Sequence, residues 1–381
     1  MKTIDQSAIR KQNMRKILAQ LIRHPQMTRQ ALTEATGVSL MTVTNLIDVL
    51  REQQVLAFSP VQRDGRKCYG RKAENISLRG DGHAWLILDL SGRRFRYTLM
   101  GFDLTVVRTG ASEEAAGGYV ESLYAFLRRV RGELDAALDG RALLGVGVVT
   151  PGPYEIARDR ITNQRLPELN ALRIKQTLTE QLGPFEYYVD EDVKFAVRAF
   201  DALTQQNTCE LLYYLYIGEG VGGAAVHNGN LLRGLNATAG DAGQLLGPHG
   251  IYENDLSQQA FATRLGLCGD TGRDVQATDI AQVAAQSPER YRQALCQSAQ
   301  SAADMLHGVL WLLDPTHIVI DCRYAGPFGE MYIEQVCEAL RRQSGGDRQL
   351  PCIVAAPQEM SSVLRGAIIV LQREWIEHIV S

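Results

Sequence analysis

Residues 27–56, "MTRQALTEATGVSLMTVTNLIDVLREQQVL", decide the fold at the front of this chain, because they predict two short helices joined through one glycine. Thr28 can cap a first helix that runs to about Ala35, with Leu32 and Ala35 facing inward, and Ser39 can cap a second helix. Gly37 lies between them, where a tight turn needs a positive φ. Two short helices at this spacing are the helix-turn-helix pattern.

The second helix has a buried side and an outward side. Four apolar residues recur at helical spacing on the buried side: Val43, Leu46, Ile47 and Leu50. The outward positions hold groups that can reach base edges in a DNA groove. With the capping serine included, the candidate DNA-contacting residues of this helix are Ser39, Met41, Thr42, Thr44 and Asn45.

A basic loop follows the two helices. Residues 55–78, "VLAFSPVQRDGRKCYGRKAENISL", read as two strands around a loop that contains Asp64-Gly65. This loop and its flanks hold cations that suit phosphates or a minor groove, and the candidates are Arg63, Arg66, Lys67 and Arg71. Since "NMRKILAQLI" adds an amphipathic helix in front, residues 1–80 are predicted to form a winged helix-turn-helix.

The charge distribution favours a polyanion as the partner of this front module. Residues 1–80 hold 14 Lys and Arg against 6 Asp and Glu, whereas the remainder holds 26 against 37. A basic module on an acidic body indicates that the front binds double-stranded DNA. The alternative is a three-helix packing module whose basic loop is only a solvated hairpin.

The bulk composition bounds the class of protein. A chain of 381 residues, 45% hydrophobic and 22% charged, is long enough for two or three domains with their own cores. Its apolar runs are shorter than a membrane span and its start carries no apolar signal region, so we expect a cytoplasmic protein with no membrane partner. The 7 cysteines are scattered without a CxxC pair, which argues against a disulfide framework and a zinc knuckle.

The body, from about residue 82, alternates strands and helices around glycine-rich turns. "ALLGVGVVTPGPYE" is a buried strand that ends in a Pro-Gly-Pro loop. "ELLYYLYIGEGVGGAAVHNGNLLRG" reads as strand, glycine turn and strand, and "SAADMLHGVLWLLDPTHIVIDC" reads as a helix and a buried strand. This alternation predicts an α/β body that is too long for one compact lobe.

The order of these segments resembles the ROK family (repressors, open reading frames and kinases). "GVGVVTPGPYE", "VDEDVKFAV", "GEGVGGAAVHNGNLLRG", "AGDAGQ" and "LLDPTHIVI" occur in the family's order and at similar spacings. The resemblance implies a two-lobed body of the actin-like sugar-kinase type. Its first lobe would comprise residues 82–193 plus about 364–381, and its second lobe residues 194–363, with an oligomerisation surface. A winged helix-turn-helix in front is the arrangement of the family's repressors, whereas its kinases lack it.

The family's nucleotide motifs are altered in this chain. "DLSGR" stands where the family has Asp-x-Gly-Gly-Thr, "GEGVGG" where it has Gly-Thr-Gly-x-Gly-Gly, and "DCRYAG" where it has a glycine-rich adenosine loop. Glu219 therefore takes a position beside the phosphates, which a carboxylate repels. We expect a body with no catalytic residues and no cofactor, and Arg93 is a possible ion-pair partner for Glu219.

The family's zinc motif, a Gly-His followed by a Cys-rich loop, also departs from the pattern. Gln244 takes the position of the histidine, and no cysteine lies between Cys209 and Cys268. Thiolate and imidazole are the ligands that a structural zinc site needs. We therefore expect no metal, and His249 nearby is expected to be a surface residue.

The sugar pocket that the resemblance implies is only partly retained. Asp192 matches the family's catalytic Asp, with Glu191 and Lys194 in place of two asparagines, and Asp241 replaces a Glu. The candidate effector-binding residues are Arg165 (or Asn163), Asp192, Asp241 and Gln244. Arg165 and Lys194 suit an anionic sugar derivative or are solvated. The pocket thus binds an altered ligand or none.

These observations predict a DNA-binding transcriptional regulator, a repressor of carbohydrate-related genes, that reads two half-sites as a homodimer or homotetramer. One alternative is a sugar kinase in which Asp192 is the base. Another is a regulator controlled by a protein partner rather than a sugar. In the favoured reading Asp192 contacts ligand or packs between lobes, and Asp190 or Glu191 caps the helix that follows.

Overall fold

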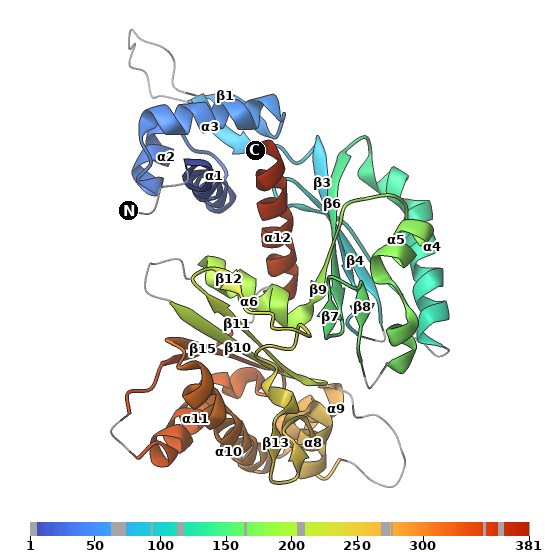
Figure 1. The fold of residues 1–381 in the computed structure, drawn as a ribbon, viewed down its shortest axis with the longest axis vertical. Coiled ribbons are helices and arrows are strands. Elements are labelled where there is room, and N and C mark those ends of the chain that lie inside the picture. The colour runs from blue at the N-terminus through green and yellow to red at the C-terminus, as the bar shows by residue number, and fades with distance from the viewer. Residues whose placement is uncertain are drawn as a thin grey trace. The chain divides into compact units, whose positions relative to one another are not determined.

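The computed structural model describes residues 6–61, 74–92, 94–112, 118–163, 166–203, 210–267, 275, 277–345, 348–356 and 362–380. The chain divides into two compact units, Met1–Asp190 with Ala367–Ser381, and Glu191–Gly366 (Figure 1). No helix in the described part of the chain is both long and apolar enough to cross a bilayer. The finer domain boundaries expected from the sequence, at residues 80, 193 and 363, stay predictions.

The front of the first unit has the expected winged helix-turn-helix elements. They are α1 (Gln6–Arg23), α2 (Arg29–Thr36), α3 (Leu40–Glu52) and the antiparallel strands β1 (Leu56–Pro60) and β2 (Glu74–Leu78). The Thr28 hydroxyl accepts the Ala31 amide at 3.2 Å, and the Ser39 hydroxyl accepts the Thr42 amide at 3.2 Å. Both predicted caps are confirmed, and Gly37 has the expected positive φ of 67°.

The three helices share one small core. Its most buried side chains include Met14, Ile17, Leu32, Val43, Ile47 and Leu50. One inward position expected from the sequence is wrong, since Ala35 is exposed. The reason is the length of α2, which has 8 residues and buries only Leu32 fully. The apolar stripe expected from the pattern of a longer helix therefore does not reach the last turn of α2.

The body of the first unit is a five-stranded sheet in the order β5 (Val106–Ala111), β4 (Arg96–Gly101), β3 (His83–Asp89), β6 (Ala142–Thr150) and β9 (Tyr187–Glu191). Strand β3 pairs antiparallel with β4 and parallel with β6. Leu86 and Leu88 lie in the core that includes α4 (Tyr119–Leu138) and α5 (Ile174–Gln181). Shorter elements complete the unit: β7 (Tyr154–Glu155), β8 (Arg160–Ile161) and η1 (Pro167–Ala171).

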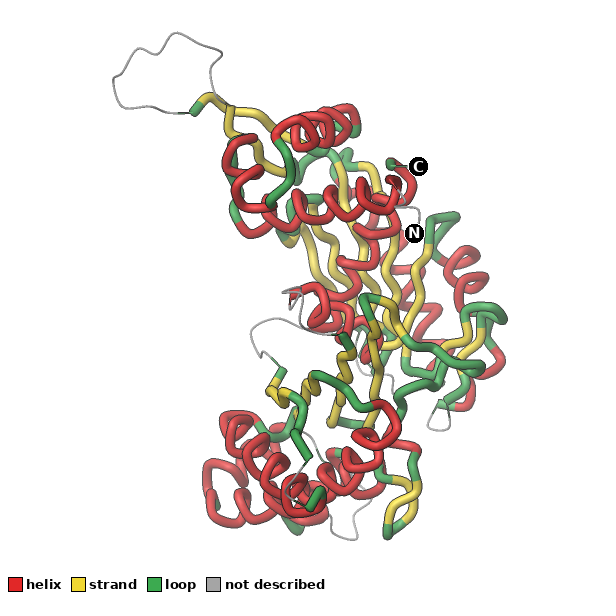
Figure 2. The backbone as a smooth tube through the Cα atoms, turned by 60° about the vertical axis from the view of Figure 1, so that its left-hand side comes forward, coloured by secondary structure: helices red, strands yellow, loops and turns green. Residues whose placement is uncertain are grey.

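The C-terminal helix α12 (Ser362–Ile379) packs on the sheet of the first unit (Figures 1 and 2). A Cβ added to Gly145 or Gly147 would lie 3.2 or 3.3 Å from Leu371, so these glycines give the helix a close approach to β6. The ring of Trp375 meets Phe102 edge-on, with centroids 5.0 Å apart. The last part of the chain is thereby joined to its first sheet.

The second unit also contains a five-stranded sheet, in the order β12 (Asn230–Leu231), β11 (Val221–His227), β10 (Leu211–Ile217), β15 (His317–Cys322) and β16 (Cys352–Ala355). Strands β10 and β11 form an antiparallel hairpin, and β15 pairs parallel with β10 and β16. The "GEGVGG" segment, residues 218–223, comprises the turn of this hairpin and the first three residues of β11. The expected α/β body is confirmed.

Successive side chains of β10 point to opposite faces of this sheet, as they do in any strand. Leu212 and Tyr214 pack with α6 (Asp192–Leu203), while Tyr213 and Leu215 pack in the larger core. The helices of that core include α7 (Glu253–Leu256), α8 (Gln258–Arg264), α9 (Ala277–Gln286), α10 (Pro288–Leu313) and α11 (Gly329–Gln343). Short elements between them are η2 (Ala242–Gln244), β13 (Leu246–Gly247), β14 (Gly250–Ile251) and η3 (Gly326–Phe328).

The turn at Gly37 provides a test of the helix-turn-helix backbone. A Cβ at this position meets no atom within 4 Å, so Gly37→Ala changes only the backbone energy at φ 67°. We expect Gly37→Ala to lower the free energy of unfolding by roughly 1–2 kcal/mol in urea titrations followed by circular dichroism. Gly132→Ala is the matched control, because Gly132 is exposed within α4 and its Cβ is also uncontacted.

Because alanine is more favourable than glycine in a helix interior, Gly132→Ala is expected to raise the free energy of unfolding by about 0.5–1 kcal/mol. Equal effects of the two substitutions would contradict the assigned turn.

Candidate functional site

The outward face of α3 is the first candidate site. Met41 is 76% exposed, and Ser39 and Asn45 are also exposed, whereas Thr42 and Thr44 are half-buried. The Thr44 hydroxyl donates to the Leu40 carbonyl at 2.8 Å, and the hydroxyls of Ser39 and Thr42 lie 2.9 Å apart. Because these hydroxyls already have partners on the helix, Met41 and Asn45 are the side chains most available to a ligand.

Two arginines of α2 and α3 contact side chains of the hairpin strands β1 and β2. Arg29 and Arg51 approach the Glu74 carboxylate at 3.6 and 3.8 Å, and the Arg51 guanidinium lies 4.1 Å from the centre of the Phe58 ring. These pairs fix the base of the wing. The four predicted wing contacts, Arg63, Arg66, Lys67 and Arg71, lie outside the described residues, as do Arg93 and the candidate effector residue Arg165. Their roles stay predictions.

The start of α6 in the second unit is the second candidate site. The Lys194 ammonium is 1% exposed and binds both the Glu191 carboxylate and the backbone carbonyl of Ala237. A buried charge is costly unless it is paired and hydrogen-bonded, and Lys194 is both. The alternative that Lys194 is solvated is therefore wrong, whereas its contact with an anionic ligand stays a prediction.

The loop that carries Asp241 is held against the β10–β11 hairpin by close backbone contacts. The Tyr213 hydroxyl donates to the Gly240 carbonyl at 2.8 Å. A Cβ at Gly223 would lie 2.3 Å from that same carbonyl oxygen, and one at Gly243 would lie 2.2 Å from the Val221 carbonyl oxygen. The glycines of "GEGVGG" and "AGDAGQ" thus have a packing role, since a side chain at either position would displace the loop.

Asp241 is poised to change its charge near neutral pH. Its Oδ1 is buried and has no hydrogen-bond partner among the described residues. Burial is the largest cause that raises the pKa of Asp241; with the carboxylates of Glu191 and Glu253 added and the Lys194 ammonium opposing them, the pKa is about 7. An unsatisfied buried acceptor is costly, and a hydroxyl donor from a ligand would satisfy it.

The other two effector candidates lie near this carboxyl group. Asp192 is half-buried, adds a weaker repulsion to Asp241, and accepts the Val193 amide at 2.6 Å. Asp192 is the first residue of α6, so Glu191, one of the two residues expected to cap this helix, directly precedes it. Gln244 is exposed and donates to the Glu253 carboxylate at 3.1 Å.

Glu253 is a site residue that the sequence analysis missed. The zinc-loop Glu of the resembled pattern has no visible counterpart by spacing, yet α7 brings Glu253 beside Gln244 and Asp241. The only sequence feature that marks Glu253 is its place in the first turn of a helix, where an acid ordinarily interacts with the helix dipole.

His249 is exposed as expected and lies 3.2 Å from Asp255. Within the described ranges, no three His, Cys, Asp or Glu side chains are grouped as metal ligands.

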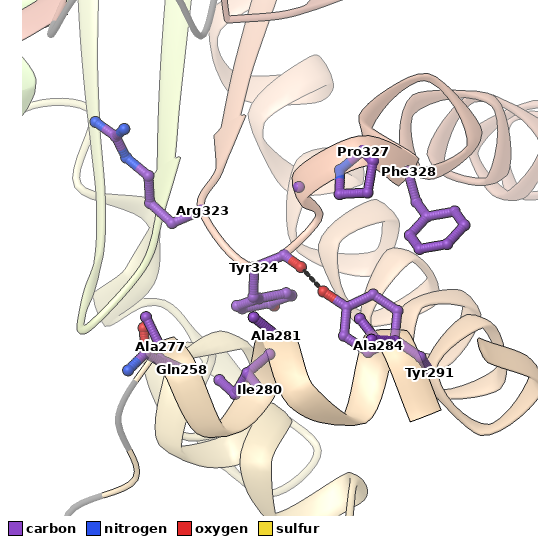
Figure 3. Close-up of a pocket in the computed structure, with 12 residues that line it drawn as sticks. Gln258, Ala277, Ile280, Ala281, Ala284, Tyr291, Arg323, Tyr324, Pro327 and Phe328 are labelled. Carbon is purple, nitrogen blue, oxygen red and sulfur yellow. Dashed lines mark hydrogen bonds between the residues drawn. The ribbon is translucent and has the colours of Figure 1, made fainter. Parts of the chain in front are cut away.

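A separate pocket of about 450 Å³ lies between α9 and the segment after β15 (Figure 3). One wall is alanine-rich and includes Ala281 and Ala284, and the facing wall holds the rings of Tyr291, Tyr324 and Phe328. The tyrosine hydroxyls are engaged: Tyr291 donates to the Tyr324 carbonyl, and Tyr324 to the Leu256 carbonyl. Arg323, Tyr324 and Gly326 of the "DCRYAG" segment line this pocket.

Charges of both signs lie near the pocket, and they include the Arg292 guanidinium, 5.4 Å from the centre of the Phe328 ring. The Arg323 guanidinium at its edge is paired with Asp321 at 3.2 Å. Burial is the main cause that raises the pKa of the neighbouring Tyr216; Asp192, Asp321 and Glu219 add to it, whereas Arg323 lowers it. Glu219 itself is exposed at the hairpin turn. The pairing of Arg323 with Asp321 and the carboxylates of Asp192 and Glu219 disfavour a polyphosphate beside Arg323.

The capped helix pair and basic front define the class of the protein, one with a winged helix-turn-helix DNA-binding domain, and the profile of that domain matches residues 10–56. The chain belongs to the ROK family, whose profile matches residues 86–374. Both the recognised family and the predicted fold class are confirmed.

Curated relatives include a repressor and a bifunctional enzyme. The Xylose repressor of Caldicellulosiruptor bescii is 20% identical over 352 residues, covering 86% of this chain and 87% of the repressor. The Bifunctional enzyme NanE/NanK of Brucella melitensis is 31% identical over 150 residues, which cover 38% of this chain and 27% of the enzyme.

Solved structures share the fold. A ROK family transcriptional regulator, a homolog of the E. coli MLC protein, aligns with a TM-score of 0.71 at 15% identity and covers 98% of this chain and 99% of its own. The ROK hexokinase of Thermus thermophilus aligns with a TM-score of 0.57 at 22% identity, covering 74% of this chain and 96% of its own. The hexokinase covers less of this chain than the regulator does.

The pKa of Asp241 predicts how stability depends on pH. Because the folded carboxyl keeps its proton to about pH 7 and the unfolded one releases it near pH 3.8, the free energy of unfolding falls as pH rises between these values. Asp241→Asn removes this dependence. We expect it to exceed the wild type in stability at pH 8 by on the order of 1–2 kcal/mol, and to match it below pH 4, in urea titrations.

Glu338→Gln is the control, because Glu338 is exposed on α11. A stability difference between Asp241→Asn and wild type that is constant from pH 4 to pH 8 would refute the assignment.

Proposed function

We propose that this chain is a transcriptional repressor of carbohydrate-related genes, which binds operator DNA through α3 and whose affinity for DNA is set by a small sugar at the start of α6. It would act in the cytoplasm, where the operator is. The observation that carries the proposal is the capped α3, with Met41 and Asn45 exposed opposite its buried stripe. The relationship to the Xylose repressor over most of both chains supports it.

The proposed DNA contact uses the outward face of α3 in a major groove. An exposed Asn amide can bind adenine with two hydrogen bonds, and a methionine side chain can pack against a thymine methyl group. One good base contact discriminates by about 1–3 kcal/mol, so a single short helix gives limited affinity. A homodimer or homotetramer that reads two half-sites would supply the remainder.

The proposed effector is an uncharged sugar. Asp192 and Asp241 are carboxylates that can accept sugar hydroxyls, and Glu253 lies beside them. The only cation of this cluster, Lys194, is already bound to Glu191 and Ala237, so an anionic sugar derivative would meet repulsion among the described residues. Xylose, from the name of the repressor relative, is a reasonable first probe.

We also propose that the body does not transfer phosphate. Asp192 has the position of a general base in the resemblance, yet a base requires a phosphoryl donor to complete the reaction. Glu219 at the hairpin turn and the Arg323–Asp321 pair disfavour nucleotide phosphates. The sugar-kinase alternative is tested by incubating the protein with ATP, Mg²⁺ and a panel of sugars, where turnover above a protein-free blank would establish it.

The DNA proposal predicts two different mutational signatures. Asn45→Ala should change the preferred base at one position of each half-site and alter total affinity by less than about tenfold. Arg66→Ala with Lys67→Ala should weaken binding to every duplex and lower the slope of log K against log salt by roughly 1–2. In vitro selection followed by fluorescence anisotropy at several salt concentrations measures both.

Identical sequence preferences in wild type and Asn45→Ala, with unchanged salt slopes in the double variant, would contradict the assigned surface.

The effector proposal predicts that sugar affinity depends on pH. A hydroxyl that donates to Asp241 favours its ionised form, so binding competes with the proton held up to about pH 7. We expect affinity to rise about tenfold from pH 6 to pH 8 in calorimetric titrations with xylose and related neutral sugars. Asp241→Asn should bind more weakly and without this pH dependence.

Absence of heat with every sugar, together with a protein that releases the chain from DNA, would favour the alternative of control by a protein partner.

A further inference from the structure

Helix α12 crosses the boundary between the two compact units. Its residues up to Gly366 belong to the second unit, and those from Ala367 belong to the first. The other crossing lies between Asp190 and Glu191, immediately before α6. A helix of 18 residues is about 27 Å long and moves as one body, so its two ends are mechanically linked.

The last turn of α12 forms ion pairs with α1, the first helix of the DNA-binding module (Figure 2). One oxygen of the Glu377 carboxylate accepts the Lys11 ammonium at 2.6 Å, and the other accepts the Arg15 guanidinium at 2.9 Å. Lys11 and Arg15 lie one turn apart on α1, so one carboxylate bridges two positions of the helix. The hydrogen bond from Lys11 lowers the pKa of Glu377, which keeps the bridge ionised at neutral pH.

The middle of α12 is anchored on the first sheet. Leu371 packs against the bare backbone of Gly145 and Gly147, and Trp375 packs on Phe102. The DNA-binding module is therefore fixed to a helix that is itself fixed to the sheet. None of these contacts involves α3, whose outward face is the proposed DNA surface.

The beginning of α12 touches the helix of the effector site within the second unit. A Cβ at Gly366 would lie 1.7 Å from the Phe195 carbonyl oxygen, so the backbones of α12 and α6 are in direct contact there. Phe195 directly follows Lys194, whose ammonium binds Glu191 and the carbonyl of Ala237 in the loop that leads to Asp241. A shift of that loop is thus transmitted to α6 and then to α12 by packed atoms.

We propose that α12 couples the effector site to the DNA-binding module, with Glu377 as the positioning residue that fixes the orientation of α1. This inference rests on the proposed function and adds its route of regulation. Packed helices change between discrete arrangements rather than deforming continuously, so a rearrangement at α6 would reorient the module as a body. Glu377 would then set which half-site spacing two modules can bind.

A purely structural role for Glu377 makes a different prediction. Exposed ion pairs contribute about 0–1 kcal/mol to stability, and the Glu377 side chain is 39% exposed. If the bridge only stabilised the fold, its loss would lower affinity for all DNA equally or not at all. A positioning role instead changes the dependence on half-site spacing and leaves the affinity for one half-site unchanged.

The test measures binding of the full-length protein to selected duplexes that carry one half-site, two half-sites, or two half-sites moved apart by about 5 base pairs, half a helical turn. We expect wild type to lose at least about tenfold in affinity on this insertion, and Glu377→Gln to lose less than about threefold, with equal affinities for one half-site. Glu338→Gln on α11 removes the same charge from an exposed, unpaired position and should behave as wild type.

Charge reversal provides a rescue. Glu377→Lys should lose spacing discrimination, and combining it with Lys11→Glu and Arg15→Glu should restore it, because the bridge is then remade with opposite signs. The link to α6 is tested by a double-mutant cycle of Lys194→Met with Glu377→Gln, with Lys194→Gln as the substitute if the Met variant does not fold. Loss of the Lys194 bridge should alter spacing discrimination only where Glu377 is intact.

Spacing discrimination in Glu377→Gln equal to wild type overturns the positioning role, and so does a uniform loss on all duplexes. Additive effects in the cycle overturn the link to α6. If wild type binds none of the duplexes, the proposed function itself fails, which is distinguishable because wild-type binding is measured first.

Discussion

The second unit depends on one buried charge, the Lys194 ammonium. With 1% exposure it has no water to solvate it, and it takes the Glu191 carboxylate and the Ala237 carbonyl instead. These two contacts join the start of α6 to the loop that leads to Asp241. Because Lys194 is already paired with Glu191, its charge only partly offsets the repulsion among the carboxylates around Asp241. The raised pKa of Asp241 follows from this arrangement together with its own burial.

The glycine-rich segments show how a motif can persist after its chemistry has changed. A glycine turn in a sugar-kinase fold indicates a phosphate site, yet here Gly223 and Gly243 are needed because carbonyl oxygens lie 2.2–2.3 Å from where a Cβ would be. Packing alone therefore preserves these glycines. Glu219, in the same turn but exposed, is under no such constraint and carries a charge that opposes phosphate. Glycines that packing requires must be distinguished from exposed positions such as Glu219 before the motif is used to assign an activity.

Local features were predictable from the sequence because their causes lie within a few residues. The caps at Thr28 and Ser39 bond to amides three residues away, and the positive φ of Gly37 needs only its own missing side chain. Glu253 was missed because its relation to Asp241 is made by a short helix after an irregular loop. Ala35 was placed wrongly because an 8-residue helix buries too narrow a stripe for its periodicity to be reliable at the end.

By itself, the sequence determined that a basic winged helix-turn-helix precedes an α/β body, because composition, periodicity and turn residues act over short distances. The tertiary structure alone decided that Lys194 is buried and paired 43 residues away, and that Glu377 bridges two cations of α1 more than 360 residues earlier. Such contacts are set by how whole elements pack. No local pattern in the chain encodes them, because each partner alone is an ordinary charged residue on a helix.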